Sequence, residues 1–204
     1  MSDIGDESDF NSTRHNGGFT NISEAYVSKS GFTRMFSAVR YGKRYMLKCL
    51  KPDFAYTPIY RQALMKEFEI GLQLDHPNIC RTISMEPVGE LGDCIVMEYV
   101  DGETLEAAVK GGNMTEDKVR KIASQLLDAM EYMHAKQTVH RDIKPSNIML
   151  THRGGDVKLI DFGLSDSETF CVLKIPAGTI GYMAPEQLQP GAKSDPCADI
   201  YSFG

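Results

Sequence analysis

The sequence lacks a long apolar run, since no stretch approaches the roughly 20 apolar residues that a membrane helix needs. It also lacks the charged start and apolar core of a secretory signal, because its N-terminal stretch is polar and acidic. A basic excess is missing as well: the net charge is −6, which argues against a nucleic-acid partner. We therefore expect no membrane segment and no nucleic acid among its partners.

Cysteine is scarce and shows no pairing pattern. The cysteines are five in number, form no C-x-x-C pair and have no nearby histidine that would complete a zinc site. This pattern predicts reduced thiols and a cytoplasmic protein. The five positions are Cys49, Cys80, Cys94, Cys171 and Cys197.

What is present is the composition of an ordinary globular protein, with 42% hydrophobic and 25% charged residues over 204 positions. Such a chain is long enough for one large domain or two small lobes. Residues 1–18 are rich in Ser, Asp, Asn and Gly and have few apolar side chains. They predict a flexible tail, because burial cannot repay the entropy of ordering them.

The first half of the chain reads mostly as β-structure with one helix. Residues 20–50 show strand-like runs and a turn at Gly42, which predict three antiparallel strands. Residues 59–74 change to helical spacing, and strand character resumes at 79–84 and 93–99. The apolar residues that show this helical spacing are Leu64, Met65, Phe68 and Leu72.

The second half reads mostly as helix, after a hinge near residues 98–103. Thr115 is the expected N-cap of a helix, with Glu116 and Asp117 in its first turn, where the helix dipole favours acidic residues. One apolar stripe follows and predicts a core-facing helix. Its members are Val119, Ile122, Leu126, Met130 and Met133.

The stretch HRDIKPSN carries the chemistry. Pro145 interrupts regular helix there, so the loop can direct Asp142, Lys144 and Asn147 at one centre. A carboxylate accepts a hydroxyl proton, an ammonium neutralises phosphate and an amide oxygen ligates a hard cation. Together with the carboxylate of Asp161 in DFG, they suit the transfer of a phosphoryl group to an alcohol.

These motifs resemble those of the eukaryotic-type serine/threonine protein kinase family. From about residue 26 onward the family's order is kept in MLKCL, HPNI, IVMEYV, HRDIKPSN, DFG, GTIGYMAPE and DIYSFG. The resemblance implies an α+β, bilobal fold with a β-rich N-lobe at residues 19–100 that contains one helix. A mostly helical C-lobe would occupy residues 101–204, and it is expected to be partial because the sequence stops at the start of the family's central C-lobe helix.

The resemblance also assigns catalytic roles. Lys48 matches the lysine that holds the nucleotide's α- and β-phosphates, and Glu67 matches the helix glutamate that pairs with that lysine. Asp142 matches the catalytic base, and Lys144 matches the lysine that steadies the transferred phosphoryl group. The cofactors implied are ATP and Mg²⁺. The metal ligands implied are Asn147 and Asp161, and Asp199 is expected to brace the catalytic loop.

The nucleotide site departs from the family. Its three loop glycines are replaced by Ser28, Ser30 and Thr33, while Gly31 remains and Met35 stands for the usual valine. A Cβ at these positions restricts how closely the backbone approaches phosphates, so we expect altered or weaker ATP binding. The hydroxyl groups and the nearby Arg34 can still contact phosphate, so we do not expect binding to be lost. The other residues assigned to the nucleotide are Met46 in place of alanine, Met97 as gatekeeper, Glu98, Val100 and Met149.

The substrate class follows from Lys144 in DIKPSN and Thr179 in GTIGY, which resemble kinases that phosphorylate Ser or Thr of proteins. Two alternatives stay open: a weak or inactive pseudokinase that acts as a scaffold, and an inactive fragment with an incomplete C-lobe. A small-molecule kinase is a third reading, which the peptide-docking segment GTIGYMAPE opposes. Arg141 is the expected partner of a phosphate on Ser165, Ser167 or Thr169.

Overall fold

The computed structural model describes residues 16–27, 31–112, 114–163, 179–188 and 195–204. The chain divides into two compact units, which we call the first unit (Met1–Leu64 with Thr82–Tyr99) and the second unit (Met65–Arg81 with Val100–Gly204). Most of the tail predicted at residues 1–18 lies outside the described residues. None of the described helices has the length and apolar character needed to cross a membrane.

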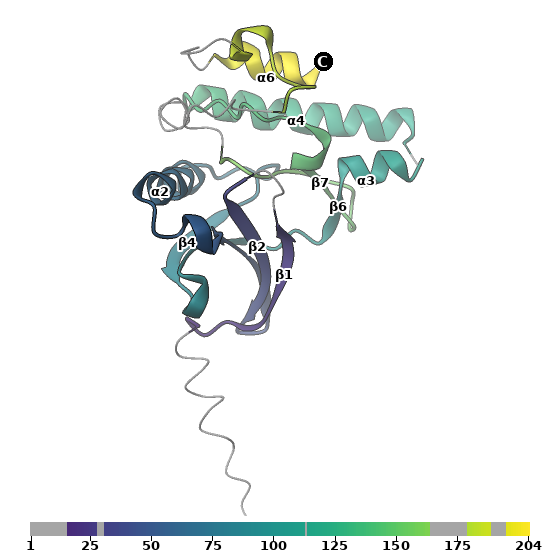
Figure 1. Cartoon of the computed structure of the whole chain (residues 1–204). Helices are drawn as coiled ribbons and strands as arrows, with labels where there is room; N and C mark the ends of the chain where they lie inside the picture. Colours follow the sequence, from purple (N-terminus) through teal and green to yellow (C-terminus); the bar gives the residue numbers. More distant parts are fainter. Residues whose placement is uncertain (1–15, 28–30, 113, 164–178, 189–194) are drawn as a thin grey trace, which may run out of the picture. The chain divides into compact units, whose positions relative to one another are not determined.

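The first unit contains a five-stranded antiparallel sheet in the order β1-β2-β3-β5-β4 (Figure 1). The three-stranded meander predicted at residues 20–50 is confirmed as β1 to β3. Tyr41 and Gly42 join β2 to β3 with φ of 53° and 74°, as a two-residue turn between twisted strands requires. The strands are β1 Thr20–Val27, β2 Thr33–Arg40, β3 Lys43–Leu50, β4 Thr82–Pro87 and β5 Asp93–Glu98.

One face of this sheet forms the core of the first unit. Side chains alternate along each strand, so every second residue of β2, β3 and β5 lies on this face. Residues outside the central strands, including Phe19 and Val88, complete the cluster. The buried members are Phe19, Phe36, Ala38, Leu47, Cys49, Val88, Cys94 and Val96.

Helix α2 (Pro58–Leu72) confirms the helix predicted at residues 59–74. Of the apolar residues whose spacing predicts the helix, Met65 and Leu72 are 44% and 54% exposed. The buried side of α2 is instead centred on Ala63, Leu64 and Glu67. The spacing of large apolar residues thus gives the helix correctly, while its buried side also includes a small residue and a carboxylate.

The strand predicted at residues 79–84 begins later, as β4 at Thr82. The preceding residues pair with the second unit's sheet instead: the Leu159 N–H donates to the Asn78 carbonyl at 2.8 Å, and the Cys80 N–H donates to the Leu159 carbonyl at 2.8 Å. The strand at 93–99 is confirmed as β5, Asp93–Glu98. Short 3₁₀ turns, η1 Pro52–Phe54 and η2 Gly89–Leu91, precede α2 and β5.

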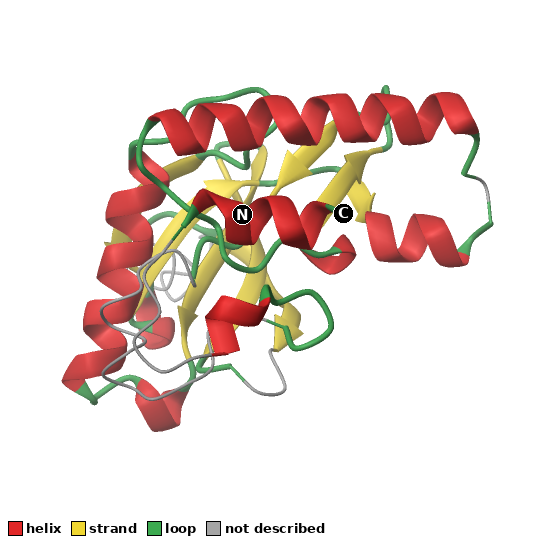
Figure 2. Ribbon diagram, turned by 90° about the horizontal axis from the view of Figure 1, so that it is seen from above, coloured by secondary structure: helices red, strands yellow, loops and turns green. Residues whose placement is uncertain are grey.

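The second unit combines helices with a small antiparallel sheet in the order β6-β7-β8. Figure 2 shows α4 as a long uninterrupted helix. Its remaining elements are β6 Gly102–Thr104, α3 Leu105–Lys110, α4 Glu116–Ala135, η3 Pro145–Asn147, β7 Ile148–Thr151, β8 Val157–Leu159, η4 Pro185–Leu188 and α6 Pro196–Phe203.

Helix α4 begins as predicted, because the Thr115 hydroxyl accepts a hydrogen bond from the Lys118 N–H at 3.4 Å. The prediction that Val119 belongs to the buried stripe of this helix is wrong, because Val119 is 50% exposed. The first residue of α4 that packs into the core of the second unit is Ile122, about one turn later. Ala129 is fully buried in the same stripe. The other four predicted members, Ile122, Leu126, Met130 and Met133, are buried.

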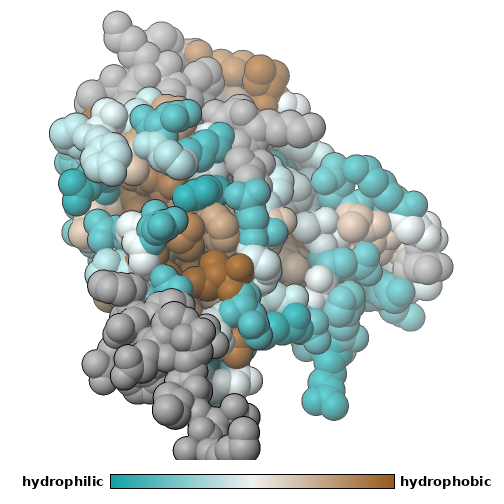
Figure 3. Space-filling view, turned by 60° about the horizontal axis from the view of Figure 1, so that its bottom comes forward, coloured by the Kyte–Doolittle hydropathy of each residue, from teal (hydrophilic) through white to brown (hydrophobic). Residues whose placement is uncertain are grey.

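The described surface is mixed in character. On the face drawn in Figure 3, hydrophilic residues cover much of the area, with smaller hydrophobic areas between them. Among the described residues, Tyr41 and Tyr56 are the most exposed large apolar side chains, at 92% each. The cysteines Cys49, Cys80, Cys94 and Cys197 are free thiols, and Cys171 lies outside the described residues.

Candidate active site

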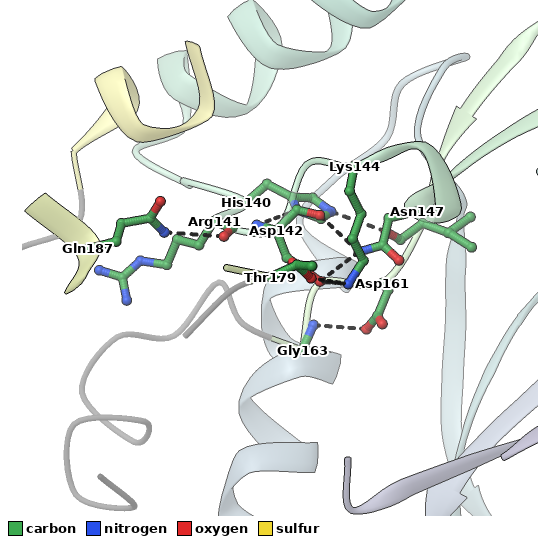
Figure 4. Close-up of polar contacts among 10 residues, drawn as sticks. His140, Arg141, Asp142, Lys144, Asn147, Asp161, Gly163, Thr179 and Gln187 are labelled. Atoms are coloured by element: carbon green, nitrogen blue, oxygen red, sulfur yellow. Dashed lines mark hydrogen bonds and ion pairs between the residues drawn. The ribbon is translucent and has the colours of Figure 1, made fainter. Parts of the chain in front are cut away.

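The predicted base Asp142 is the centre of a hydrogen-bonded group in the second unit (Figure 4). Its Oδ2 accepts hydrogen bonds from Lys144 Nζ at 2.6 Å and from Asn147 Nδ2 at 2.9 Å. Its Oδ1 accepts one from the Thr179 hydroxyl at 2.8 Å. Asp142 is only 7% exposed, so these donors replace the water that its carboxylate would otherwise bind.

Thr179 connects a distant segment to this carboxylate. Lys144 Nζ also donates to Thr179 Oγ1 at 2.6 Å, so the ammonium contacts both the carboxylate and the hydroxyl. The sequence predicted Thr179 only as a marker of substrate class, and its contact with Asp142 was missed. No spacing signal relates the two, because 37 residues separate them.

The predicted metal ligands Asn147 and Asp161 flank the β7–β8 hairpin. The register pairs Ile148 with Leu159, and the Ile160 N–H donates to the Asn147 carbonyl at 2.9 Å. Both amide hydrogen-bond contacts of Asn147 Nδ2 go to Asp142, to its main-chain oxygen and to Oδ2. The side-chain oxygen of Asn147 is therefore the atom that suits a hard cation.

Asp161 lies in an uncommon backbone conformation at the end of this hairpin. Its φ is 67°, in the left-handed region that Asp tolerates better than most residues. The side chain is exposed, and its Oδ1 accepts a hydrogen bond from the Gly163 N–H at 3.3 Å. An exposed carboxylate beside the hairpin also has the chemistry that suits a hard cation.

His140 is a structural partner of the group that sequence reasoning missed. Its ring is fully buried; Nδ1 accepts a hydrogen bond from the Asp142 N–H at 3.3 Å, and Nε2 lies 3.1 Å from the Ile160 carbonyl. This pattern requires a neutral ring with its proton on Nε2. The ring also packs edge-on against Phe162 at 5.1 Å, so His140 links the loop of Asp142 to the segment of Asp161.

Asp199 of α6 holds the backbone of the loop, as expected of a brace. The carboxylate is fully buried and accepts hydrogen bonds from the N–H groups of His140 at 2.8 Å and Arg141 at 2.7 Å, and from His134 Nε2 at 2.9 Å. Burial alone would raise the pKa of Asp199, but the His134 hydrogen bond and the two backbone donors hold it below its ordinary value. The residue is therefore an anion in the folded protein.

Arg141 is held in place from a second side. Its φ is 70°, and its carbonyl accepts a hydrogen bond from Gln187 Nε2 at 3.2 Å. Gln187 of η4 also accepts one from the Ala184 N–H at 2.9 Å, a contact that no sequence motif indicated. The Arg141 guanidinium extends away from Asp142 (Figure 4). Its predicted phosphate-bearing partners, Ser165, Ser167 and Thr169, lie outside the described residues.

The predicted nucleotide residues of the first unit share one face of its sheet. Met46 lies directly opposite Met97 across β3 and β5, and Lys48 lies opposite Met35 across β2 and β3. Met46 and Lys48 are two residues apart on β3, so all four side chains are on the same face. This is the face opposite the core of the first unit, and Lys48 on it is 4% exposed. Thr33 begins β2 on this face, and Glu98 ends β5.

The remaining predicted residues are distributed over both units. Gly31 immediately precedes Phe32 and β2 in the first unit, whereas Ser28 and Ser30 lie outside the described residues. Glu67 of α2 is 7% exposed, and it belongs to the second unit together with Val100 and Met149 of β7. Lys48 and Glu67 are both buried. Burying a lysine or a glutamate costs free energy unless its charge is paired or hydrogen-bonded.

Comparison with known proteins points to one family. The family model for the protein kinase domain matches residues 29–204. Mitogen-activated protein kinase kinase 9 of Arabidopsis thaliana is 42% identical over 171 residues, which cover 78% of this chain and 52% of that protein. Mitogen-activated protein kinase kinase 7 of the same plant is 38% identical over 173 residues, with coverages of 80% and 53%.

A bacterial relative extends the similarity. Serine/threonine-protein kinase PrkC of Bacillus subtilis is 35% identical over 164 residues, which cover 78% of this chain and 24% of that protein. The chain thus spans about half the length of the two plant relatives and a quarter of the bacterial one. Together with the family match over residues 29–204, these similarities show that the chain belongs to the protein kinase family.

Proposed function

We propose that this chain belongs to a serine/threonine protein kinase that transfers the γ-phosphoryl group of Mg-ATP to a hydroxyl group of a protein substrate. The observation that carries the proposal is the Asp142 carboxylate with its three side-chain donors, Lys144, Asn147 and Thr179. The relatives named above, two mitogen-activated protein kinase kinases and a serine/threonine-protein kinase, support the substrate class.

In this proposal Asp142 accepts the proton of the substrate hydroxyl as the phosphoryl group is transferred. The Oδ1 atom is held by the Thr179 hydroxyl, which a substrate hydroxyl of similar chemistry can replace or join. Lys144 places an ammonium 2.6 Å from Oδ2, where it offsets the negative charge of the transferred group. The fixed donors keep the carboxylate oriented before the substrate arrives.

The oxygen atoms of Asn147 and Asp161 fit a hard cation such as Mg²⁺. When bound, Mg²⁺ neutralises charge on the nucleotide phosphates. The β7–β8 hairpin fixes the spacing of the two residues through the Ile160 to Asn147 backbone hydrogen bond. Lys48 would hold the α- and β-phosphates and pair with Glu67, in an N-lobe at residues 19–100 and a C-lobe at 101–204.

The nucleotide would be held by hydroxyls where the family has glycine, at Ser28, Ser30 and Thr33 beside Gly31. The adenine would lie against the methionine face of the first unit, Met35, Met46 and Met97. The family resemblance also assigns Glu98, Val100 and Met149 to the nucleotide. We also infer a cytoplasmic location, because the described cysteines are free thiols.

A scaffolding pseudokinase is the second candidate function. Thr33 has a Cβ where the family's loop has glycine, and Met46 is much larger than the alanine expected there. Both changes act on nucleotide binding, whereas the groups around Asp142 are complete. The two candidate functions therefore differ in whether phosphate is transferred, and the Asp142→Asn variant distinguishes them.

The test compares the wild-type protein with Asp142→Asn, using labelled ATP, Mg²⁺ and generic protein substrates. Transfer is expected to fall by about 100-fold or more when the base is lost. Asp53→Asn, an exposed acid of η1, is the matched control and should retain wild-type transfer. Equal transfer by wild type and Asp142→Asn would refute the kinase proposal, and ATP binding without transfer would identify the pseudokinase.

A further inference from the structure

Three aromatic side chains of the first unit form a cluster at the predicted phosphate loop. Phe32 follows Gly31 directly at the tip of that loop, just before β2 begins. The rings of Phe32 and Tyr60 have centroids 5.1 Å apart with planes inclined by 44°, and Phe54 meets Tyr60 edge-on at 4.7 Å. Tyr60, in the first turn of α2, therefore contacts both other rings.

Backbone hydrogen bonds join the same segments. The Lys51 N–H donates to the Phe32 carbonyl at 2.8 Å, and the Phe54 N–H donates to the Lys51 carbonyl at 2.9 Å. The Thr57 N–H then donates to the Phe54 carbonyl and the Tyr60 N–H to the Thr57 carbonyl, each at 3.1 Å. The loop tip, η1 and the start of α2 are thus connected through side chains and through main chain.

The cluster matters because of the loop that it holds. The sequence around Phe32 is poor in glycine, which restricts the backbone of the loop, and the ring contact of Phe32 with Tyr60 places a further constraint on its tip. Edge-on and tilted aromatic pairs add stabilisation beyond simple burial. The ring of Tyr60 contacts both Phe32 and Phe54 of the turn before α2.

We propose that Tyr60 is a positioning residue, which holds the tip of the nucleotide-binding loop against the start of α2. The consequence for nucleotide affinity rests on the proposed kinase function. Seven residues after Tyr60, about two helical turns, the same helix carries Glu67 on the same side. A loop tip that Tyr60 holds is therefore anchored to the helix that bears the predicted partner of the phosphate lysine.

The chain contains no tryptophan, so Phe32→Trp creates a single fluorescent reporter at the loop tip. In this background Tyr60→Ala should shift the emission to longer wavelength and raise acrylamide quenching at least twofold. Tyr60→Phe keeps the ring and should leave both signals unchanged. Tyr56→Ala is the matched control, because Tyr56 is 92% exposed and only four residues away. Equal quenching in the Tyr60→Ala and Tyr56→Ala proteins would overturn the proposal.

The second measurement is ATP affinity without the reporter. Tyr60→Ala should raise the KM or Kd for ATP by about 3- to 10-fold, the range expected for the loss of an aromatic pair, while Tyr60→Phe restores it. Unchanged affinity despite increased quenching would also overturn the positioning role. If the wild-type protein binds no ATP at all, the proposed kinase function fails, and the quenching comparison still decides whether Tyr60 holds the loop.

Discussion

Met46 of β3 and Met97 of β5 lie directly opposite each other in the sheet of the first unit, on the face that also carries Lys48. Directly opposite residues have Cβ atoms about 4.5–5.5 Å apart, so the two thioether chains compete for the same space. Both are only partly buried. A flat adenine ring that approaches this face meets two flexible side chains. Met97 stands at the family's gatekeeper position, and Met46 stands where the family has the much smaller alanine.

Met46→Ala should therefore bind ATP more tightly. Removing an overpacked side chain recovers about 1 kcal/mol, which corresponds to roughly fivefold in affinity. Calorimetric titration of ATP into the purified protein measures the change. Met65→Ala, which removes a methionine that is 44% exposed on α2, is the control and should leave the affinity unchanged. Equal or weaker ATP binding by the Met46 variant would contradict the crowding argument.

Asp199→Asn should destabilise the protein. The wild-type carboxylate accepts hydrogen bonds from the backbone of His140 and Arg141 and from His134, whereas an amide turns an NH₂ group toward at least one of these donors. We expect a loss of about 3 kcal/mol in the free energy of unfolding, measured by urea denaturation. Asp195→Asn is the matched control, because Asp195 is the N-cap of α6 and asparagine caps equally well. Equal stability of the two variants would argue against the brace.

The same carboxylate predicts a dependence of stability on pH. The folded pKa of Asp199 is held below its ordinary value of 3.8, so the folded state binds its proton less readily than the unfolded state. The stabilisation that ionised Asp199 gives to the folded state is fully present above the unfolded pKa of this residue, and it is lost as the pH falls through the folded pKa. The stability difference between wild type and Asp199→Asn should stay constant from pH 7 to about 5 and shrink below about pH 4. A stability difference between the two proteins that stays the same below pH 4 would contradict this prediction.

Thr179→Val should slow phosphoryl transfer while leaving the fold intact. Valine has nearly the same shape, but it lacks the hydroxyl that donates to Asp142 and accepts from Lys144. Losing this connection should cost about tenfold in kcat, and Thr179→Ser should keep most of the rate. Initial rates at saturating ATP test the prediction, with the thermal unfolding midpoint as a check. A valine variant as fast as wild type would mean that the hydroxyl is dispensable.

Local chemistry predicted the elements best where one residue type has a fixed role. The turn at Gly42 and the cap at Thr115 followed from backbone conformation and capping, and both are present. Burial was predicted less well, because it depends on what packs against an element. Val119 and Leu72 fit their helical stripes but are exposed, since the cores lie elsewhere along those helices.

The candidate site divides in the same way. Convergence was predictable for Asp142, Lys144 and Asn147, because they are close in sequence and Pro145 keeps their segment from forming a regular helix. The contacts of Thr179 and Gln187 with this loop were not predictable, because they join residues 35 to 46 positions apart. Only the folded chain brings such segments together.

The brace from Asp199 also sets an order of events during synthesis. Arg141 precedes the carboxylate that holds its backbone by 58 residues. A ribosome that adds about 5–20 residues per second reaches the aspartate about 3–12 seconds later. During this interval the backbone N–H groups of His140 and Arg141 lack the buried carboxylate that they bind in the folded protein. The loop of Asp142 can therefore reach its folded conformation only after α6 has been synthesised and packed.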